Sequence, residues 1–419
     1  MRFNKISIIG LGYIGLPLAV AFSKYYKVIG FDLNKIRIKS LKSGHDYNLD
    51  IEREKILKNK FIPTYFEKDL VGSNIFIVTV PTPITKKNKP DLKHLKNASL
   101  IVGKYLKKKS IVIYESTVYP GLTEEICKPI LEKISGLKSP NDFGIGYSPE
   151  RVNPGDKKHT LEKISKIVSG QNNRICNQIY LLYKKIIKKR IIKASSIKVA
   201  ESAKVIENIQ RDLNIAFVNE LSIIFHKIKV NTNEVIDLAS TKWNFAKYKP
   251  GLVGGHCISV DPYYLTHKST LCGYKPKFIL SGRSINNNMP NYIVNNIKKI
   301  MKLKKKKNIN FFGVTFKENC PDIRNSLSLR IINVLKKKYK VFVHDPYHEN
   351  KTINNFKIKK ISQIKKNSIN VISVSHNYYL KNKKKIIRSF FNKDSFIFDL
   401  KNIFSQKDII KYNLNTWQL

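Results

Sequence analysis

The sequence predicts an α/β protein in which two doubly wound parallel-sheet domains are joined by a helical domain with a long connecting helix. Three observations lead to this class. Short apolar strands alternate with helices over about the first 195 residues, a long run of helical apolar spacing follows from Ser196, and the alternation restarts after residue 304. Such alternation is typical of parallel sheets covered by helices on both faces. The 419 residues are enough for two or three domains.

The first predicted domain, residues 1–195, begins with a strand, a glycine turn, an apolar helix and a second strand that ends at Asp32. Three further strands are predicted in "SNIFIVTVP", "KSIVIYEST" and "DFGIGYSPE". Helices are predicted in "DLKHLKNASLIVGKYL", with Asp91 as a candidate N-cap, and in "TEEICKPILEKI". In an open parallel sheet, ligands lie beyond the carboxyl ends of the strands, so we expect a site there.

The second predicted domain, residues 196–304, is helical. Its first segment, 196–230, keeps apolar residues at helical spacing and contains neither proline nor glycine. This is longer than an ordinary globular helix, which suits a connector that also offers a face to a second subunit, and we therefore expect a homodimer. Shorter helices are expected to follow, up to about residue 300.

The third predicted domain, residues 305–419, is a second and smaller α/β unit. Strands are predicted in "INFFGVTF", "KVFVHDP", "NVISVSH" and "SFIFDL", and a helix in "SLSLRIINVLKKK". Both α/β ends are therefore expected to be Rossmann-like. They are alike in architecture only, because the sequence shows no short internal repeat.

The formal net charge is +48, from 78 Lys and Arg against 30 Asp and Glu. Such an excess suggests a nucleic acid or another anionic surface as partner. The lysines are scattered over predicted loops and helix ends, however, and accompany abundant isoleucine and asparagine, whose codons are also A/T-rich. Solvated faces and genome composition explain the charge without a partner, so a polyanion-binding protein is kept as the alternative of another class.

The five cysteines stand at positions 127, 176, 257, 272 and 320. The count is odd and no C-x-x-C pair occurs, which favours a reducing compartment over a disulfide framework or a zinc ribbon. The histidines show no ligand spacing, so no metal is expected. The amino terminus lacks the features of a signal peptide, and no apolar run is long enough to span a bilayer. We therefore expect a cytoplasmic protein with no membrane partner.

The segment "GLGYIG", Gly10 to Gly15, follows a predicted strand and opens a predicted helix. In this context Gly10 permits a tight turn, Gly12 lets the backbone approach a pyrophosphate, and Gly15 lets the helix pack on the strand. The N–H groups of the helix amino terminus then face the phosphates. A carboxylate at Asp32 would accept from a ribose 2′-hydroxyl, which favours NAD over NADP. FAD, or no nucleotide at all, is the competing interpretation.

The segment "GGHCISVDP" places Cys257 after two glycines and four residues before Asp261. Exposed backbone N–H groups or a nearby cation could favour the thiolate, the form that attacks carbon. The aspartate could handle protons or orient a water or a lysine. The competing interpretation is a turn cysteine without a role.

In "AKVIENIQR" on the long predicted helix, Lys204, Asn208 and Arg211 are spaced i, i+4 and i+7 and share one face. A partly buried lysine beside an amide can stabilise an oxyanion or relay a proton. A solvated stripe on a lysine-rich chain is the competing interpretation.

The predicted strand ends "VTVPTP", "YESTVYPG" and "YSPERVNPG" carry a set of polar residues. These are Thr82, Thr117, Glu150 and Arg151. Their positions beyond the strands suit ligand binding, whereas ordinary turn chemistry is the competing explanation.

Taken together, the chain resembles the UDP-glucose/GDP-mannose dehydrogenase family over essentially its whole length. The resemblance rests on seven segments in order: "GLGYIGLPLA", "VPTP", "EST", "SPERVNPG", "AKVIEN", "GGHCISVDPYYL" and "GVTFKENCPDIRNS". The histidine in "GGHC", together with "TKWNF", is similar to the branch that acts on UDP-N-acetylglucosamine or UDP-N-acetylgalactosamine in capsule and O-antigen synthesis.

The resemblance implies a four-electron oxidation of the sugar C6 alcohol to a carboxylate, with two NAD⁺ reduced in turn. Cys257 would hold the aldehyde as a thiohemiacetal and then as a thioester until water releases the acid. Lys204 and Asn208 would stabilise the oxyanion, and Asp261 would assist through water or Lys204. Glu150 and Thr117 would position the hydrolytic water.

The resemblance also assigns binding residues. The positions that would contact NAD are Gly10, Gly12, Tyr13, Ile14, Gly15, Asp32, Arg37, Thr82, Thr117 and Arg324. The positions that would contact the UDP-sugar are Arg151, Val152, Lys204, Asn208, Arg211, Gly254, Phe316 and Lys317.

The chain departs from its family at a few positions. Lys249 and Lys401 stand where arginine is common in relatives, which keeps the charge but loses the planar fork. Ser284 and Asn287 stand where relatives tend to have arginine and aspartate. These changes affect affinity and stability more than reaction type. Within the enzyme class, UDP-glucose 6-dehydrogenase is the alternative function.

Overall fold

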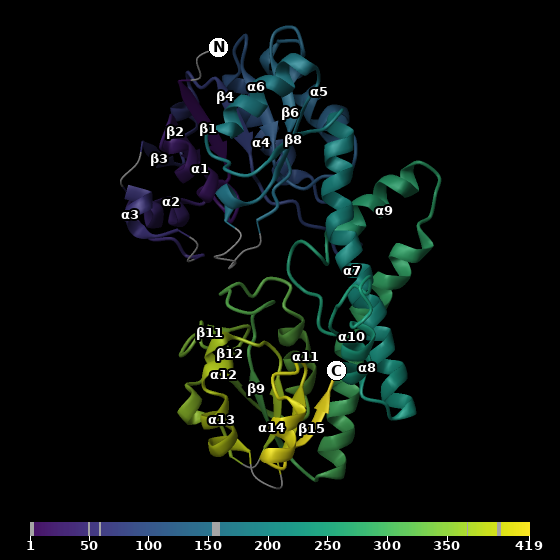
Figure 1. Cartoon of the computed structure of the whole chain (residues 1–419). Coiled ribbons are helices and arrows are strands. Elements are labelled where there is room, and N and C mark those ends of the chain that lie inside the picture. Colours follow the sequence, from purple (N-terminus) through teal and green to yellow (C-terminus); the bar gives the residue numbers. More distant parts are fainter. Residues whose placement is uncertain (1–3, 49–50, 58–59, 153–159, 367, 392–394) are drawn as a thin grey trace. The chain divides into compact units, whose positions relative to one another are not determined.

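The computed structural model describes residues 4–48, 51–57, 60–152, 160–366, 368–391 and 395–419 (Figure 1). By contacts the chain forms two compact units, one made of Met1–Asn208 with Val260–Lys275 and the other of Ile209–Ser259 with Pro276–Leu419. The division into 1–195, 196–304 and 305–419 stays a prediction. The segment 153–155 of "SPERVNPG" lies outside the described residues.

The first unit contains a sheet with the strand order β3-β2-β1-β4-β5-β6-β7-β8 among the described residues. Every neighbouring pair is parallel except β6 and β7, which pair antiparallel. The strands are β1 (Lys5–Ile9), β2 (Lys27–Phe31), β3 (Phe61–Thr64), β4 (Ile75–Val78), β5 (Ile111–Tyr114), β6 (Gly144–Tyr147), β7 (Lys166–Gly170) and β8 (Ile191–Lys193).

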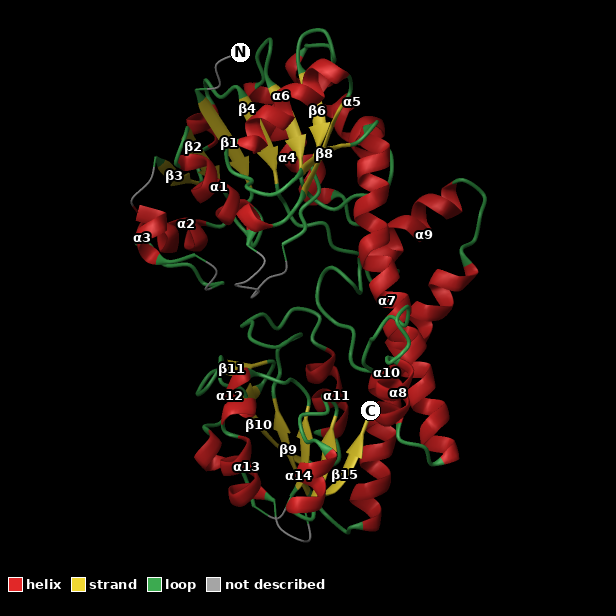
Figure 2. Ribbon diagram, in the orientation of Figure 1, coloured by secondary structure: helices red, strands yellow, loops and turns green. Residues whose placement is uncertain are grey.

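Helices cover both faces of this sheet (Figure 2). Because side chains alternate along a strand, Ile75 and Ile77 of β4 pack in one core with α1 and α6, while Phe76 and Val78 pack in another with α4 and α5. The helices are α1 (Gly15–Ser23), α2 (Lys35–Lys42), α3 (Arg53–Leu57), α4 (Lys93–Tyr105), α5 (Lys128–Ser135), α6 (Asn173–Lys184) and α9 (Asp261–Leu271), with short turns η1 (Glu67–Leu70), η2 (Thr123–Cys127) and η3 (Leu161–Lys163). The doubly wound class is confirmed.

Helix α7 (Ile197–Ile228) confirms the predicted long helix at 196–230. It contributes Ile197–Asn208 to the first unit and Ile209–Ile228 to the second. The helices that follow are shorter than the 32 residues of α7, as expected, although α10 (Lys277–Leu303) still has 27 residues. The sequence pattern did not indicate one long helix here because Gly282 and Pro290 are helix breakers, yet both are buried within α10. A Cβ on Gly282 would lie 2.5 Å from Leu213, so the glycine permits close packing against α7.

The second unit contains a parallel sheet with the order β10-β9-β13-β14-β15 and a hairpin of β11 and β12. Two cores lie on its faces, one with α10 and α11 and the other with α12 and α13. The strands are β9 (Asn308–Phe312), β10 (Lys340–His344), β11 (Thr352–Ile353), β12 (Phe356–Lys357), β13 (Ile369–Ile372), β14 (Phe396–Asp399) and β15 (Asn415–Gln418). The helices are α8 (Thr232–Ala239), α11 (Leu327–Leu335), α12 (Asn377–Lys381), α13 (Lys383–Phe390) and α14 (Gln406–Lys411), with the short turn η4 (Ile361–Gln363).

None of the helices in the described part of the chain is both long enough and apolar enough to cross a membrane.

Candidate active site

The turn between β1 and α1 is held by close backbone contacts. Gly10 adopts φ +97°, a conformation that L side chains rarely adopt, and its N–H donates to Phe31 O at 2.8 Å. A Cβ on Gly15 would lie 1.8 Å from Gly10 O and 2.6 Å from Thr79 Oγ1. The Thr79 hydroxyl in turn donates to Gly10 O at 2.7 Å. Only glycine fits at position 15, as the sequence predicted.

Gly12 differs from Gly10 and Gly15, because a Cβ built there would meet nothing within 4 Å. The fold itself therefore leaves this position open. Tyr13 and Ile14 follow, both half-buried, and Ile14 is the N-cap of α1 without a side-chain cap. The first turn of α1 also has no acidic residue. The amino terminus of α1 thus keeps its positive dipole available for an anion.

Asp32 lies at the end of β2, beside this turn. Its carboxylate accepts from the N–H groups of Leu11 and Asn34, both at 2.8 Å. Arg37, a predicted NAD contact, is buried and donates through Nε to Leu11 O at 3.0 Å and through Nη1 to Asp46 at 2.8 Å. Its Nη2 is buried without a hydrogen-bond partner among the described residues. Arg37 thus braces the turn and keeps one donor group unused.

Thr82 and Thr117 follow β4 and β5, two neighbouring strands, and both are half-buried. The Ser116 hydroxyl donates to Val80 O at 2.7 Å and ties the two loops together. The two threonines are thus placed at the carboxyl edge of the sheet, as predicted.

Glu150 follows β6 and is 6% exposed. Its Oε1 accepts from the N–H groups of Arg151 and Val152 at 2.7 and 2.5 Å. The Arg151 guanidinium pairs with Glu207 of α7 at 2.8 Å and donates to Ser165 O at 3.1 Å. Arg151 therefore anchors this loop to α7. It also stands at the carboxyl edge of the first sheet, where ligand binding was predicted.

Lys204, Asn208 and Asp261 form a buried cluster in the first unit. Asn208 Nδ2 donates to Asp261 Oδ2 at 2.5 Å, and the three side chains are between 2 and 8% exposed. Burial raises the pKa of Asp261 to about 6, while Lys204 and Asn208 oppose the rise. The solvated stripe is thus wrong for Lys204 and Asn208. Arg211, on the same helix, is exposed.

Cys257 belongs to the second unit, where it lies in the turn that begins at Gly255, and it is half-buried. Gly255 adopts φ +85°, and Asn325 Nδ2 donates to its carbonyl at 3.0 Å. A Cβ on Gly254 would lie 2.7 Å from Asn325 O, and one on Gly255 would lie 2.7 Å from the Phe316 ring. The cysteine turn therefore packs tightly against the segment that carries Phe316, and side chains at these glycines would separate them.

The imidazole of His256 stands beside the thiol in sequence, with Nδ1 3.8 Å from the Asp322 carboxylate. Burial lowers the pKa of His256 to about 4, and Arg324 lowers it further while Asp322 opposes the change. The ring is therefore neutral at neutral pH. The predicted NAD contact Arg324 forms a chelated pair with Asp322, with Nη2 to Oδ2 at 2.6 Å, and its side chain is 52% exposed.

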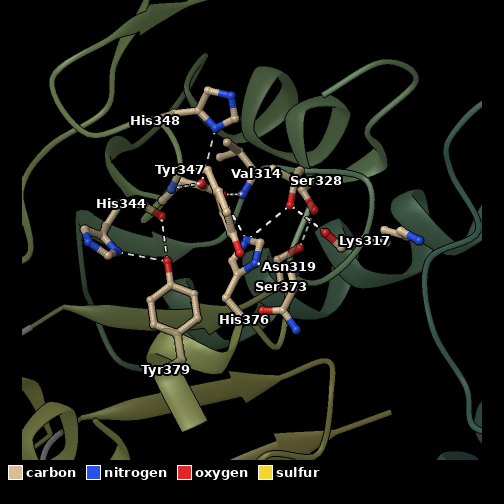
Figure 3. Close-up of polar contacts among 12 residues, drawn as sticks. Val314, Lys317, Asn319, Ser328, His344, Tyr347, His348, Ser373, His376 and Tyr379 are labelled. Atoms are coloured by element: carbon tan, nitrogen blue, oxygen red, sulfur yellow. Dashed lines mark hydrogen bonds and ion pairs between the residues drawn. The ribbon is translucent and has the colours of Figure 1, made fainter. Parts of the chain in front are cut away.

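The loop that carries Phe316 and Lys317 follows β9 and is held by a buried network (Figure 3). Asp345 accepts from Val314 N–H at 2.8 Å. His376 lies 3.3 Å from the Asp345 carboxylate through Nε2, and its Nδ1 accepts from Asn319 N–H at 3.0 Å. Both ends of the loop are thus tied to one buried aspartate–histidine pair, while the Lys317 side chain points away from the network.

Burial would raise the pKa of Asp345, but hydrogen bonds from His348 and His376 and from the Val314 N–H hold it well below its usual range. Sequence reasoning did not select Asp345 or His376. The sequence did contain a usable signal. Asp345 directly follows His344, the last residue of β10, and His376 lies just beyond β13, so both stand at the carboxyl edge of the second sheet. The corresponding edge of the first sheet was the criterion that selected the predicted residues of the first domain.

The turn, the open Gly12 and the uncapped α1 fit a pyrophosphate, and Asp32 fits a ribose hydroxyl. The fold and this site define a dinucleotide-binding α/β protein.

Three family models match the chain in order: the NAD binding domain (4–187), the central domain (198–288) and the UDP binding domain (310–406) of the UDP-glucose/GDP-mannose dehydrogenase family. The chain belongs to this family. It is an NAD-dependent nucleotide-sugar dehydrogenase, NAD is its cofactor, and a UDP-sugar is its substrate class.

Three relatives illustrate the similarity. The chain is 48% identical over 412 residues to the UDP-N-acetyl-D-glucosamine 6-dehydrogenase of Salmonella typhi, covering 95% of this chain and 96% of the relative. It is 51% identical over 354 residues to the enzyme of the same name from Pseudomonas aeruginosa, covering 83% and 84%. The solved UDP-D-ManNAc dehydrogenase of Pyrococcus horikoshii is 30% identical with a TM-score of 0.88, covering 99% and 98%. These similarities support an enzyme rather than a polyanion-binding protein.

Proposed function

We propose that the protein oxidises a UDP-N-acetylhexosamine at C6 to the uronic acid. The 48 and 51% identity to two relatives named UDP-N-acetyl-D-glucosamine 6-dehydrogenase favours that substrate, against 35% over 360 residues to a relative named UDP-N-acetyl-D-mannosamine dehydrogenase. UDP-N-acetylgalactosamine differs only at one sugar carbon and stays in the proposal, and UDP-glucose is the alternative. The role in capsule or O-antigen synthesis also stays a proposal.

Bound NAD⁺ would supply the acceptor for one hydride in each of two successive oxidations of the sugar. Gly10, Gly12 and Gly15 with the N–H groups of Tyr13 and Ile14 would hold its pyrophosphate. Asp32 would hold the ribose. The remaining residues proposed to contact NAD are Arg37, Thr82, Thr117 and Arg324.

Cys257 would hold the half-oxidised sugar. Its S–H adds across the aldehyde C=O, which gives a thiohemiacetal, and loss of a second hydride from that carbon together with the hydroxyl proton gives a thioester. Water then attacks the thioester carbonyl, the C–S bond breaks, and the acid leaves with the thiol restored. A covalent bond of this kind keeps the aldehyde from escaping between the two oxidations.

The observation that carries the proposal is the buried cluster of Lys204, Asn208 and Asp261. A buried ammonium and an amide N–H are the donors that an oxyanion at C6 needs, and they act strongly because the site is dry. The raised pKa of Asp261, about 6, lets it accept a proton from Lys204 or from water and release it near neutral pH.

Glu150 and Thr117 would position the hydrolytic water at the carboxyl edge of the first sheet. The UDP-sugar would be held by a further set of side and main chains, which includes the two oxyanion residues. These are Arg151, Val152, Lys204, Asn208, Arg211, Gly254, Phe316 and Lys317.

A substrate panel tests the proposal. The protein is incubated with NAD⁺ and UDP-N-acetylglucosamine, UDP-N-acetylgalactosamine or UDP-glucose, and reduced nicotinamide is followed by absorbance. We expect the highest kcat/KM with an N-acetylhexosamine. Preference for UDP-glucose by tenfold or more would contradict the proposal and establish the alternative.

The exposed apolar residues on α7 support the proposed homodimer. Val199, Ile206, Phe217 and Ile224 are between 45 and 55% exposed, and their spacings of 7, 11 and 7 residues are close to whole helical turns, so they share one face of the helix. Light scattering should give about twice the 48.4 kDa chain mass. A monomer at micromolar concentration would refute the dimer.

A further inference from the structure

A fully buried lysine lies behind the proposed water-positioning residue Glu150. Lys166, the first residue of β7, is 1% exposed. Its Nζ donates to Glu115 Oε2 at 2.6 Å and to Pro149 O at 3.2 Å. The Tyr183 hydroxyl of α6 donates to the other oxygen of Glu115. The ammonium also lies 5.2 Å from the centre of the Tyr183 ring.

Lys166 is shared between two buried carboxylates. Its Nζ lies 3.8 Å from Glu150 Oε2, while Glu150 Oε1 is taken by two backbone N–H groups. Glu115 is 0% exposed and Glu150 is 6% exposed. One ammonium therefore serves two buried carboxylates, so losing Lys166 would leave both without their shared cation.

The cluster lies at the carboxyl edge of the first sheet, where the candidate active site is placed, and not in the middle of the hydrophobic core. Glu115 directly follows β5 and Pro149 follows β6, so the ammonium ties two neighbouring strand ends together. Apolar residues of similar volume would stabilise such a location as well as a buried ion pair does. A buried charge that contacts the peptide just before Glu150 is therefore better explained by what it does to Glu150.

Burial raises the pKa of Glu115 to about 7, Lys166 opposes the rise, and Glu150 adds to it. The Glu115 charge also acts on Tyr183 and Tyr147, and burial raises the pKa of each well above its usual range. Glu115 is thus the member of the cluster that changes protonation near neutral pH.

We propose that Lys166, braced by Glu115 and Tyr183, is a positioning residue that fixes the place of Glu150 for hydrolysis of the thioester. This inference rests on the proposed function, because it assumes that Glu150 positions the hydrolytic water. The inference gives a role to Lys166, Glu115 and Tyr183, which have none in the proposed function. Lys166 lies beside Glu150 and its loop, and Glu115 holds Lys166, so both would act through Glu150 rather than on the reacting atoms.

The test separates oxidation from hydrolysis by rapid mixing of enzyme, NAD⁺ and UDP-N-acetylglucosamine. The early burst of NADH reports the two oxidations, and the later rate of uronic acid release reports hydrolysis. Lys166→Met should slow acid release at least tenfold, leave the NADH burst within twofold, and accumulate acylated Cys257 by mass spectrometry. Lys166→Arg should restore most of the rate. The control is Lys188→Met, which removes an exposed lysine paired with Glu162 on the surface.

The pH profile gives a second readout that a merely structural role would not move. Acid release by the wild type should show a titration near pH 7, and Glu115→Gln should remove it, because an amide at this position cannot change its charge. If Lys166→Met does not fold, Lys166→Arg and Glu115→Gln still carry the test. Equal slowing of burst and release by Lys166→Met, or a Glu115→Gln profile that superposes on the wild type, would overturn the inference.

Failure of the proposed function would be recognised separately. In that case the wild type itself would form no acylated Cys257, or Glu150→Gln would release acid at the wild-type rate.

Discussion

The glycine turn allows its structural and cofactor roles to be separated by two single substitutions. A Cβ on Gly15 would lie 1.8 Å from Gly10 O, about 1.5 Å short of an ordinary C···O contact. Both atoms belong to a turn that Thr79 and Phe31 hold by hydrogen bonds, so the backbone must move. We expect Gly15→Ala to destabilise the protein by about 3 kcal/mol or more even without cofactor.

Gly12→Ala should behave differently. A Cβ there meets nothing within 4 Å and Gly12 has no positive φ, so the cofactor-free protein should be unchanged or stabilised by about 0.4–1 kcal/mol. The same methyl group would stand where the backbone approaches the pyrophosphate. We expect the affinity for NAD to fall at least about tenfold, a loss of about 1.4 kcal/mol or more.

Thermal unfolding of the cofactor-free protein and calorimetric titration with NAD measure the two effects. Gly251→Ala is the matched control, because a Cβ there meets only Lys401 Nζ at 3.9 Å and the residue belongs to the other compact unit. Unchanged NAD affinity in Gly12→Ala would refute the assignment of this turn to the pyrophosphate. An equal loss of thermal stability in both variants would refute the packing argument.

Three further predictions concern buried charges. Because the pKa of Asp345 is lowered in the folded protein, its ionised carboxylate stabilises the fold above about pH 4, and this contribution is lost as the pH falls. The melting temperature of Asp345→Asn should therefore fall less steeply with acid than that of the wild type, and an equal fall would refute this. Asp212→Ala should destabilise the protein by about 3–5 kcal/mol in denaturant unfolding, because it removes the carboxylate that lies 2.6 Å from the buried guanidinium of Arg283; a loss under 1 kcal/mol would contradict this. Asp261 has a raised pKa, so its favourable contribution is present below about pH 4 and is lost as the pH rises through about 6. Asp261→Asn should therefore unfold at a higher temperature than the wild type at pH 8 while its kcat falls at least tenfold, and lower stability at pH 8 would contradict the burial argument.

The sequence pattern was sufficient for the parts of the fold in which each element is locally consistent. Strands β1, β2, β4 and β5 are short apolar runs bounded by turns, and α7 has no helix breaker. Helix α10 was missed because Gly282 and Pro290 oppose its local pattern, and tertiary packing overrides them. The antiparallel pairing of β6 with β7 has no signature in either strand alone.

Spacing placed Lys204 and Asn208 on one face of a helix but could not show that both are buried or that Asp261 accepts from Asn208. That bond joins residues 53 positions apart and depends on how α9 packs. Lys166 was hidden for a similar reason. In a chain with 78 lysines and arginines a further lysine carries no signal, and only its burial beside Glu115 distinguishes it.

Cys257 is proposed to carry the sugar between the two oxidations, and the number of NADH molecules formed per sugar reports whether it does. UDP-N-acetylglucosamine is converted completely with excess NAD⁺, and NADH and uronic acid are counted for the wild type, Cys257→Ser and Cys272→Ser. Cys272 is an exposed free cysteine and serves as the matched control. We expect the wild type and Cys272→Ser to form two NADH and one uronic acid per sugar. Cys257→Ser should produce the acid at least a hundredfold more slowly. Acid formed by Cys257→Ser at the rate of the control would contradict it.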